Sequence, residues 1–314
     1  MDTAYYKEFA VLAETNNFWE ASERLYINQS TLSKHIKAME KELGAPLFHR
    51  TTRHVSLTKY GEALLPYAQS ITRMEFEYST LFMQLKDAEK GVTTLGSIPV
   101  MAQYHITGLL NAFQSHYPES TVKVIEEDAN RLSSMLLTQR CELIFTREPK
   151  LSAEKNSPED SPFVQIPYLT DHMVALLPAG HPLASKQEIS LRELKDERFC
   201  FIKESSLMYE LCTNACQAAN FIPEIAFTSH RLESIFDMVS YGNHVALLMN
   251  RHTTPVKNAM LAPESAWSTV DITPRICSQI SLCYLNNRKL SKTARNFVDF
   301  CVQEQSHPIP SHRL

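Results

Sequence analysis

The fold of the N-terminal region is decided by residues 17–46, which read NFWEASERLYINQSTLSKHIKAMEKELGAP. Asn17, with Glu20 three residues later, is typical of a helix start, and Asn28 suits the N-cap of a second helix. This second helix is predicted from apolar residues at every third or fourth position, namely Leu32, Ile36, Met39 and Leu43. Gly44 then marks its end. A short helix, a tight turn and a second amphipathic helix are the elements of a helix-turn-helix.

The flanking segments extend this pattern into a winged domain followed by a long helix. Residues 5–13 have the spacing of one amphipathic helix, and residues 47–57 indicate a small β wing with a basic tip. Thr58 can cap a helix that runs to about Lys90, and Pro66 is expected to bend it. Its apolar residues approximate a heptad seam for association with another helix, although a helix packed on its own domain shows a similar pattern. The seam residues are Leu64, Ala68, Ile71, Tyr78, Phe82 and Leu85.

Positive charge is concentrated in residues 28–60. This segment has six cations and two anions, which gives +4, whereas the whole chain has a formal net charge of −4. The cations are Lys34, Lys37, Lys41, Arg50, Arg53 and Lys59, and the anions are Glu40 and Glu42. A local excess of this kind, placed on a helix-turn-helix, favours contact with DNA phosphates.

The exposed N-terminal half of the second helix is expected to read base edges, as it does in this motif. Gln29 can pair with an adenine edge, and Ser33 can donate or accept a hydrogen bond. Arg50 and Arg53 on the wing suit the DNA backbone or the minor groove. The alternative is that these polar residues form an ordinary solvated helix face. The candidate DNA-binding residues are Asn28, Gln29, Ser30, Thr31, Ser33, Lys34, Lys37, Arg50, Arg53 and His54.

From residue 91 onward the pattern alternates between strands and helices, which favours a parallel α/β sheet. The expected strands are 95–99, 122–125, 143–145, 163–166, 173–177, 199–202, 225–227, 245–249, 270–272 and 280–285, and a last helix is expected over 291–303. The seven glycines form no phosphate-binding loop, and the sequence has no G-x-S-x-G or H-E-x-x-H motif. We therefore expect no cofactor, no metal and no enzymatic activity.

Two further observations bear on location and on thiol chemistry. The first residues do not read as a signal peptide, and no run of 18 apolar residues occurs. The seven cysteines are expected to be reduced, as in a cytoplasmic protein. Cys212 and Cys216 could share a metal or sense oxidants, but buried structural thiols are the more common case.

Residues 9–65 resemble the N-terminal domain of LysR-type transcriptional regulators. The matching positions are Phe9, Ala13, Phe18, Ala21, Leu25, Gln29, Ser33, Ile36, Glu40, Leu43, Gly44, Leu47, Phe48, Arg50, Leu57, Thr58 and Gly61. Asn17 stands where the family usually has Ser, and Ser22 replaces a common Ala. A weaker resemblance continues through Tyr117-Pro118, LLPAGHPLA at 176–184 and SYGNHVAL at 240–247.

This resemblance implies an α/β protein with three parts. They are a winged helix-turn-helix over 1–58, a linker and dimerisation helix over 59–90, and an effector-binding domain over 91–314 that resembles a periplasmic binding protein. Subdomain I of that domain would comprise about 91–167 and 268–303, and subdomain II about 168–267. The chain would cross between them near 166–169 and 265–269. The family resemblance implies a homodimer or homotetramer that binds promoter DNA under the control of a small molecule. The alternative is a solute receptor of a transport system, which the DNA-binding head disfavours.

The effector is expected in the cleft between the subdomains. Arg147 could clamp an anion, and helix N-termini at a cleft favour a carboxylate. Ile98 and Val100 are apolar where some relatives place hydroxyl groups, which disfavours a small anion bound by hydroxyls and favours an aromatic or partly apolar effector. The expected effector is therefore a carboxylate or an aromatic metabolite. Ordinary helix capping and strand-end solvation are the alternatives for these residues. The candidate effector-binding residues are Ser97, Ile98, Pro99, Val100, Met101, Thr146, Arg147, Ser205, Ser206, Thr228 and His230.

Overall fold

The computed structural model describes residues 2–50, 55–147, 161–253 and 266–306. The chain divides into two compact units, Met1–Met83 and Gln84–Leu314, and the boundary falls inside a long helix. The two units are described separately. The domain limits expected at residues 58 and 90 therefore stay predictions.

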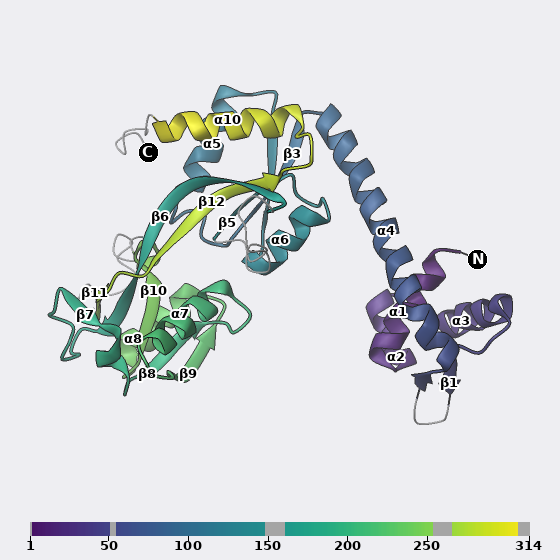
Figure 1. The fold of residues 1–314 in the computed structure, drawn as a ribbon, viewed down its shortest axis with the longest axis horizontal. Coiled ribbons are helices and arrows are strands. Elements are labelled where there is room, and N and C mark those ends of the chain that lie inside the picture. The colour runs from purple at the N-terminus through teal and green to yellow at the C-terminus, as the bar shows by residue number, and fades with distance from the viewer. Residues whose placement is uncertain (1, 51–54, 148–160, 254–265, 307–314) are drawn as a thin grey trace. The chain divides into compact units, whose positions relative to one another are not determined.

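The first unit contains the predicted winged helix-turn-helix (Figure 1). Its elements are α1 (Ala4–Thr15), α2 (Phe18–Leu25), α3 (Gln29–Leu43), β1 (Phe48–Arg50), β2 (Val55–Leu57) and the first part of α4 (Lys59–Glu89). The two strands pair antiparallel and form the base of the wing. Apolar residues from α1, α2, α3 and α4 share one core, whose fully buried members include Phe9, Leu12, Leu32, Ile36 and Met39. The predicted stripe of α3 thus points into this core.

The helix ends follow most of the local signals, with two corrections. The Asn17 side chain accepts hydrogen bonds from the backbone N–H groups of Trp19 and Glu20, which caps α2 as predicted. Asn28 occupies the N-cap position of α3, but its side chain makes no capping hydrogen bond. Leu43, the expected last member of the apolar stripe, is 43% exposed. Its position one turn beyond Met39 lies past the edge of the core.

Helix α4 starts at the predicted cap. The Thr58 hydroxyl accepts a hydrogen bond from the Gly61 backbone N–H, and Gly61 approaches Leu47 so closely that a Cβ there would lie 2.3 Å from its carbonyl oxygen. Along the seam, Ala68 is buried in the core of the first unit, whereas three later members are more than half exposed: Tyr78, Phe82 and Leu85. The early part of the helix therefore packs on its own domain, and the later part carries an uncovered apolar side.

The second unit has two lobes linked by long strands (Figure 1). One long strand, β6 (Phe163–Pro178), belongs to both lobes. The strand order is β4-β3-β5-β12-β6 in subdomain I and β6-β10-β8-β9 in subdomain II. Strand β11 also pairs with β6, and β7 pairs with β11. The strands of subdomain I are β3 (Val92–Ser97), β4 (Thr121–Glu126), β5 (Leu143–Arg147) and β12 (Cys277–Leu285), with helices α5 (Ile106–His116), α6 (Ala129–Leu137) and α10 (Lys292–Ser306). Those of subdomain II are β7 (Glu188–Ser190), β8 (Arg198–Ile202), β9 (Glu224–Ser229), β10 (Val245–Met249) and β11 (Trp267–Thr273), with α7 (Leu207–Ala218), α8 (Leu232–Tyr241) and the short 3₁₀ helix η3 (Leu191–Leu194).

The expected parallel sheet is found only in part. Strand β3 is parallel to β4 and β5, and β8 is parallel to β9 and β10. The strands that connect the lobes pair antiparallel instead. Helical crossovers build the parallel triads, whereas the linking strands enter without such crossovers and are free to run the other way.

The crossings between the lobes lie further along the chain than predicted. The segments expected as two strands, 163–166 and 173–177, form one strand, β6 (Phe163–Pro178). Its first part, as far as His172, pairs with β12, and its second part pairs with β10 and β11. The return crossing follows β11, which pairs with β6 and β7 of subdomain II. The crossings thus lie at about residues 172–173 and 274–276, because one extended strand can belong to two sheets without any local break.

Candidate functional site

The first candidate site is the exposed side of α3 in the first unit. Opposite the buried stripe, the helix presents Gln29, Ser30, Lys34 and Lys37 to solvent. Thr31 and Ser33 are half-buried at the edges of this side, and Asn28 is exposed at the N-cap position. Among the described residues, Lys34 and Lys37 form no ion pair. The face therefore carries uncompensated positive charge beside hydrogen-bonding side chains.

Two partly buried contacts hold α3 and the wing in place. His35 Nδ1 lies 2.9 Å from Oε2 of the buried Glu8 of α1, and the Tyr5 ring stacks on the imidazole. Burial raises the pKa of Glu8, against the opposing effect of His35. Glu40 Oε1 accepts hydrogen bonds from the backbone N–H groups of Leu47 and Phe48, at 2.9 and 3.2 Å. These acidic groups thus point inward, away from the cationic face.

The predicted wing contacts are only partly described. Arg50 ends β1, but its side chain lies outside the described part, as do Arg53 and His54. Their expected roles remain predictions.

The second candidate site is a cavity of about 230 Å³ between the two lobes of the second unit. Six of the predicted effector-binding residues line it: Ile98, Pro99, Val100, Arg147, Ser206 and His230. The other five are not among its lining residues: Ser97, Met101, Thr146, Ser205 and Thr228. The hydroxyls of Ser97 and Thr146 are buried and donate to neighbouring backbone carbonyls, so they are engaged within the protein.

Several lining residues carry no recognisable local signal in the sequence. They include Gln103, Asp128, Leu232 and His252. Two helices of subdomain II begin at the cavity, because Ser206 is the N-cap of α7 and Leu232 is the first residue of α8. The Ser206 hydroxyl accepts from the Tyr209 N–H and donates to the Lys203 carbonyl. It is therefore already engaged in capping.

Arg147 brings a buried positive charge to this cavity. The residue ends β5 and is 2% exposed. Its Nη2 donates to the Tyr104 hydroxyl, and the guanidinium carbon lies 4.9 Å from the centre of the Tyr104 ring. Its Nη1 is buried and has no hydrogen-bond partner among the described residues. A buried guanidinium without a matched anion is costly, so an anion in the cavity would satisfy it.

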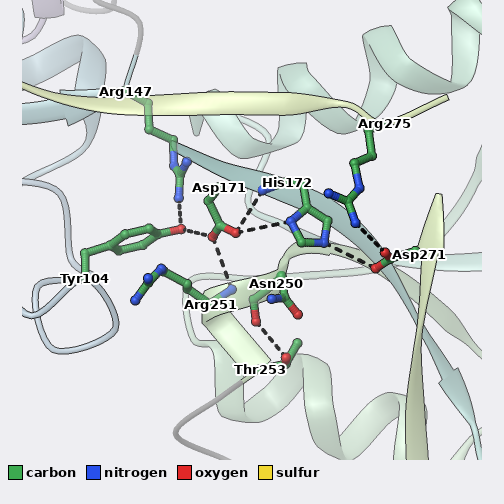
Figure 2. Close-up of polar contacts among 9 residues, drawn as sticks. All are labelled: Tyr104, Arg147, Asp171, His172, Asn250, Arg251, Thr253, Asp271 and Arg275. Atoms are coloured by element: carbon green, nitrogen blue, oxygen red, sulfur yellow. Dashed lines mark hydrogen bonds and ion pairs between the residues drawn. The ribbon is translucent and has the colours of Figure 1, made fainter. Parts of the chain in front are cut away.

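Tyr104 links Arg147 to the strand that crosses between the lobes (Figure 2). The Tyr104 hydroxyl donates to Asp171 Oδ2 at 2.6 Å, and the Arg251 backbone N–H donates to the same oxygen at 3.1 Å. Asp171 lies on β6 and is 5% exposed. Burial raises the pKa of Tyr104, against the opposing effect of the Arg147 charge. The tyrosine therefore stays protonated and continues to donate to the carboxylate.

The polar contacts continue across both crossing segments (Figure 2). The His172 backbone N–H donates to Asp171 Oδ1 at 2.8 Å, and His172 Nε2 lies 3.2 Å from Asp271 Oδ1 on β11. Arg275 donates to the other oxygen of Asp271 at 3.1 Å. Burial acts to raise the pKa of Asp271, but the hydrogen bonds from His172 and Arg275 outweigh it and lower the value. One network thus joins the cavity arginine to both crossings.

A second polar group of the cavity wall has no hydrogen-bond partner in the described part of the chain. His252 follows β10, is 3% exposed, and neither of its ring nitrogens has a hydrogen-bond partner among the described residues. Burial, together with the nearby Arg147 charge, lowers its pKa to about 3. The imidazole is therefore neutral at physiological pH and offers one donor and one acceptor.

One ion pair closes across the cleft. Lys203 Nζ, on the loop before α7, lies 2.8 Å from Asp128 Oδ2 at the start of α6. The two residues come from different lobes, so their contact depends on how far the lobes are apart.

Comparison with known proteins gives the family. Residues 6–62 match the domain described as bacterial regulatory helix-turn-helix protein, lysR family, and residues 86–306 match the LysR substrate binding domain. The chain belongs to the LysR family of transcriptional regulators. The resemblance seen in the sequence is confirmed, and the comparisons give no support to the transport-receptor alternative.

Relatives and solved structures of LysR regulators cover nearly the whole chain. An uncharacterised HTH-type transcriptional regulator of Bacillus subtilis, YwbI, is 26% identical over 95% of both chains. A probable hydrogen peroxide-inducible genes activator of Mycobacterium xenopi is 31% identical over 58% of this chain and 93% of its own. A mutant of Corynebacterium glutamicum OxyR, solved with H₂O₂ bound, has the same fold with a TM-score of 0.56, 22% identity, and coverage of 97% and 92%.

Family membership makes this chain a DNA-binding transcription regulator with an effector-binding domain. LysR regulators are generally not enzymes. Among the described residues, no helix is long and apolar enough to cross a membrane, and no group of three or more His, Cys, Asp or Glu side chains could hold a metal ion.

The similarity to peroxide regulators makes the thiols of this LysR member relevant. Cys200, Cys212 and Cys216 are all buried. Burial raises the pKa of Cys200 to about 11 and that of Cys216 to about 12, and it also raises the pKa of Cys212. Because the thiolate is the reactive form, these side chains have the character of structural thiols. No cysteine lines the cavity between the lobes.

Proposed function

We propose that this LysR-type regulator reads its operator with the first half of α3 and changes its DNA binding when an anionic effector occupies the cavity beside Arg147. Gln29 and Ser33 would contact base edges, and Lys34 and Lys37 would contact phosphates. The exposure of Gln29, Lys34 and Lys37 opposite the buried stripe of α3, with Ser33 half-buried at the edge, supports the first part of this proposal. Asn28, Ser30 and Thr31 border the same face, and Arg50, Arg53 and His54 would follow the wing.

The observation that carries the effector proposal is Nη1 of Arg147 at the cavity wall, which has no hydrogen-bond partner in the part of the chain that the structure describes. A carboxylate there would form a charge-assisted hydrogen bond with a group already held in position. Much of the remaining wall is apolar, and includes Ile98, Pro99, Val100, Leu207 and Leu232. The effector would therefore combine one anionic group with an apolar body.

The network at the crossings supplies a route from effector to response. Arg147 is joined to Asp171 on β6 through Tyr104, so an anion at Arg147 changes the electrostatic surroundings of the hinge between the lobes. The effector can shift the regulator only if it binds the two lobe arrangements with different affinity. The pair between Lys203 and Asp128 would contribute to that difference, because it exists only while the cleft is closed.

Association and location complete the proposal. The uncovered apolar side of α4, with Tyr78, Phe82 and Leu85, would pack against the same helix of a second copy in a homodimer. A homotetramer would need a further contact between effector-binding domains. The protein would act in the cytoplasm, where its DNA lies.

The experiment that tests the proposal uses the full-length chain in two steps. Fragmented genomic DNA is captured at about 0.15 M salt, because affinity depends steeply on ionic strength, and sequencing identifies the enriched promoters. A panel of small carboxylates is then tested for a change in affinity for the best promoter. Arg147→Gln is expected to keep DNA binding but to lose the response. The matched control is Arg131→Gln, which alters an exposed arginine of α6 and should respond normally. A normal response in Arg147→Gln would contradict the effector proposal.

A further inference from the structure

We infer that the effector is a hydroxylated monocarboxylate, held at its carboxylate by Arg147 and at its hydroxyl group by His252. This inference rests on the proposed function and adds the chemical class of the ligand. It depends on a second orphaned polar group in the cavity wall.

His252 has the features of a ligand-binding side chain. It lines the cavity, it is 3% exposed, and both ring nitrogens lack a hydrogen-bond partner among the described residues. A buried polar atom without a hydrogen bond is destabilising, and among the described residues neither ring nitrogen has one. The ring of Tyr104 meets the imidazole edge to face, with centroids 6.0 Å apart and an interplanar angle of 90°, which restricts its orientation.

A neutral hydroxyl is the matching partner for this imidazole. Because the ring is uncharged, it offers one N–H donor and one nitrogen acceptor, and a hydroxyl group can pair with either. Among the described lining residues, the cations are the buried Arg147 and the exposed Arg231, and the anions are Asp128 and Glu233. The nearby Lys203 is paired with Asp128 at 2.8 Å. The charges therefore favour a ligand with a single negative charge.

The volume limits the body of the ligand. An apolar cavity of about 150 Å³ accommodates a molecule the size of benzene. The space of about 230 Å³ therefore suits one ring, or one branched chain, with two small polar substituents. The apolar side chains of Ile98, Val100 and Leu232 would contact that body.

The test measures the benefit of a hydroxyl group by calorimetric titration of the full-length protein. Two parent acids are used, benzoate and 3-methylbutanoate, together with the three monohydroxybenzoates and 2-hydroxy-3-methylbutanoate. In the wild type, at least one hydroxy acid should bind about tenfold more tightly than its parent, which corresponds to about 1.4 kcal/mol. In His252→Phe this preference should fall to about twofold or less, while the affinity for the parent acid changes little.

Two further variants distinguish the loss of a hydrogen bond to the ligand from a general loss of folded protein. His252→Gln keeps a hydrogen-bonding group at the position and should retain part of the preference. His116→Phe alters an exposed histidine of α5 away from the cavity and should retain all of it. Far-ultraviolet circular dichroism establishes that each variant is folded.

The outcomes distinguish this inference from the proposed function. The ligand class is wrong if carboxylates bind through Arg147 but no hydroxyl group improves their affinity, or if His252→Phe retains the full preference. In either case the proposed anion site at Arg147 is unaffected. If no acid of either series binds, or if Arg147→Gln binds them as tightly as the wild type does, the proposed anion site is wrong. The proposed ligand class is then rejected as well.

Discussion

Replacing Tyr104 with Phe is expected to lower the free energy of unfolding of the second unit by about 2–3 kcal/mol. The Tyr104 ring is fully buried, and its hydroxyl group contacts two charged partners. It donates to Asp171 Oδ2 at 2.6 Å and accepts from Arg147 Nη2. A hydrogen bond to a charged group contributes about 1.5–3 kcal/mol. Loss of the contact with Asp171 accounts for most of the expected decrease in the free energy of unfolding. Loss of the contact with Arg147 adds less, because the arginine can turn partly toward the open cavity.

A neighbouring tyrosine provides the matched control. The Tyr168 hydroxyl donates a single hydrogen bond to the Tyr104 backbone carbonyl at 3.2 Å. Tyr168→Phe removes one bond between neutral groups and should cost only about 0.5–1.5 kcal/mol. The difference between the two variants therefore isolates the contribution of the charged partners, since each loses one phenolic oxygen.

The assay uses the two tryptophans of the chain. Trp267 is 9% exposed on β11, whereas Trp19 is 64% exposed in the first unit. In a Trp19→Phe background, fluorescence during thermal denaturation reports the second unit alone. The melting temperature should fall by about 4–12 °C, using about 2–4 °C for each kcal/mol in a unit of this size. Equal losses for Tyr104→Phe and Tyr168→Phe would refute the reasoning, because the charged contacts would then contribute nothing extra.

Three other predictions concern DNA reading, acid sensitivity and oxidants. Gln29→Ala should weaken operator binding by about 1–3 kcal/mol and leave binding to random DNA nearly unchanged. Lys37→Ala should weaken binding to both DNAs and reduce its salt dependence. Equal losses on both DNAs for Gln29→Ala would exclude base reading by this residue. The pKa of His252 is lowered from 6.5 to about 3, so the folded ring stays neutral at pH 5 while the unfolded chain takes up a proton there. The free energy of unfolding should therefore fall by about 2 kcal/mol from about pH 7 to about pH 5. His252→Phe should fall less over this range; an equal fall would contradict the assignment. Hydrogen peroxide should not act through Cys212 or Cys216, since both thiols are buried. A peroxide-dependent shift in DNA affinity that is lost in their Ser variants would overturn this view.

The DNA-binding head could be predicted closely from the sequence because its determinants are local. The apolar spacing of α3, the cap at Asn17 and the turn at Gly44 each act within a few residues. The prediction was wrong at two positions. Leu43 follows the helical spacing, yet it lies beyond the edge of the core and is exposed. Asn28 has a suitable side chain, but the helix starts without using it.

The cavity could be predicted only as a region. The strand ends and helix starts of the second unit indicated Arg147 and five other lining residues, because such ends meet at the edge of a parallel sheet. The sequence did not separate them from Ser97 and Thr146, whose hydroxyls donate to the backbone carbonyls of the next residues. Nor did it point to His252, since a single histidine after an apolar strand has no distinguishing spacing.

The sequence by itself determined the helix-turn-helix, the alternating strands and helices, and the family, since each depends on residues close together in the chain or on their types. Only the tertiary structure decided where the lobes are joined and which polar groups meet there. Tyr104 and Asp171 are 67 residues apart, and β6 passes through two sheets without a local break. Contacts of this kind arise from the packing of distant strands, whose pairing partners are set by the whole fold and not by the residues beside them.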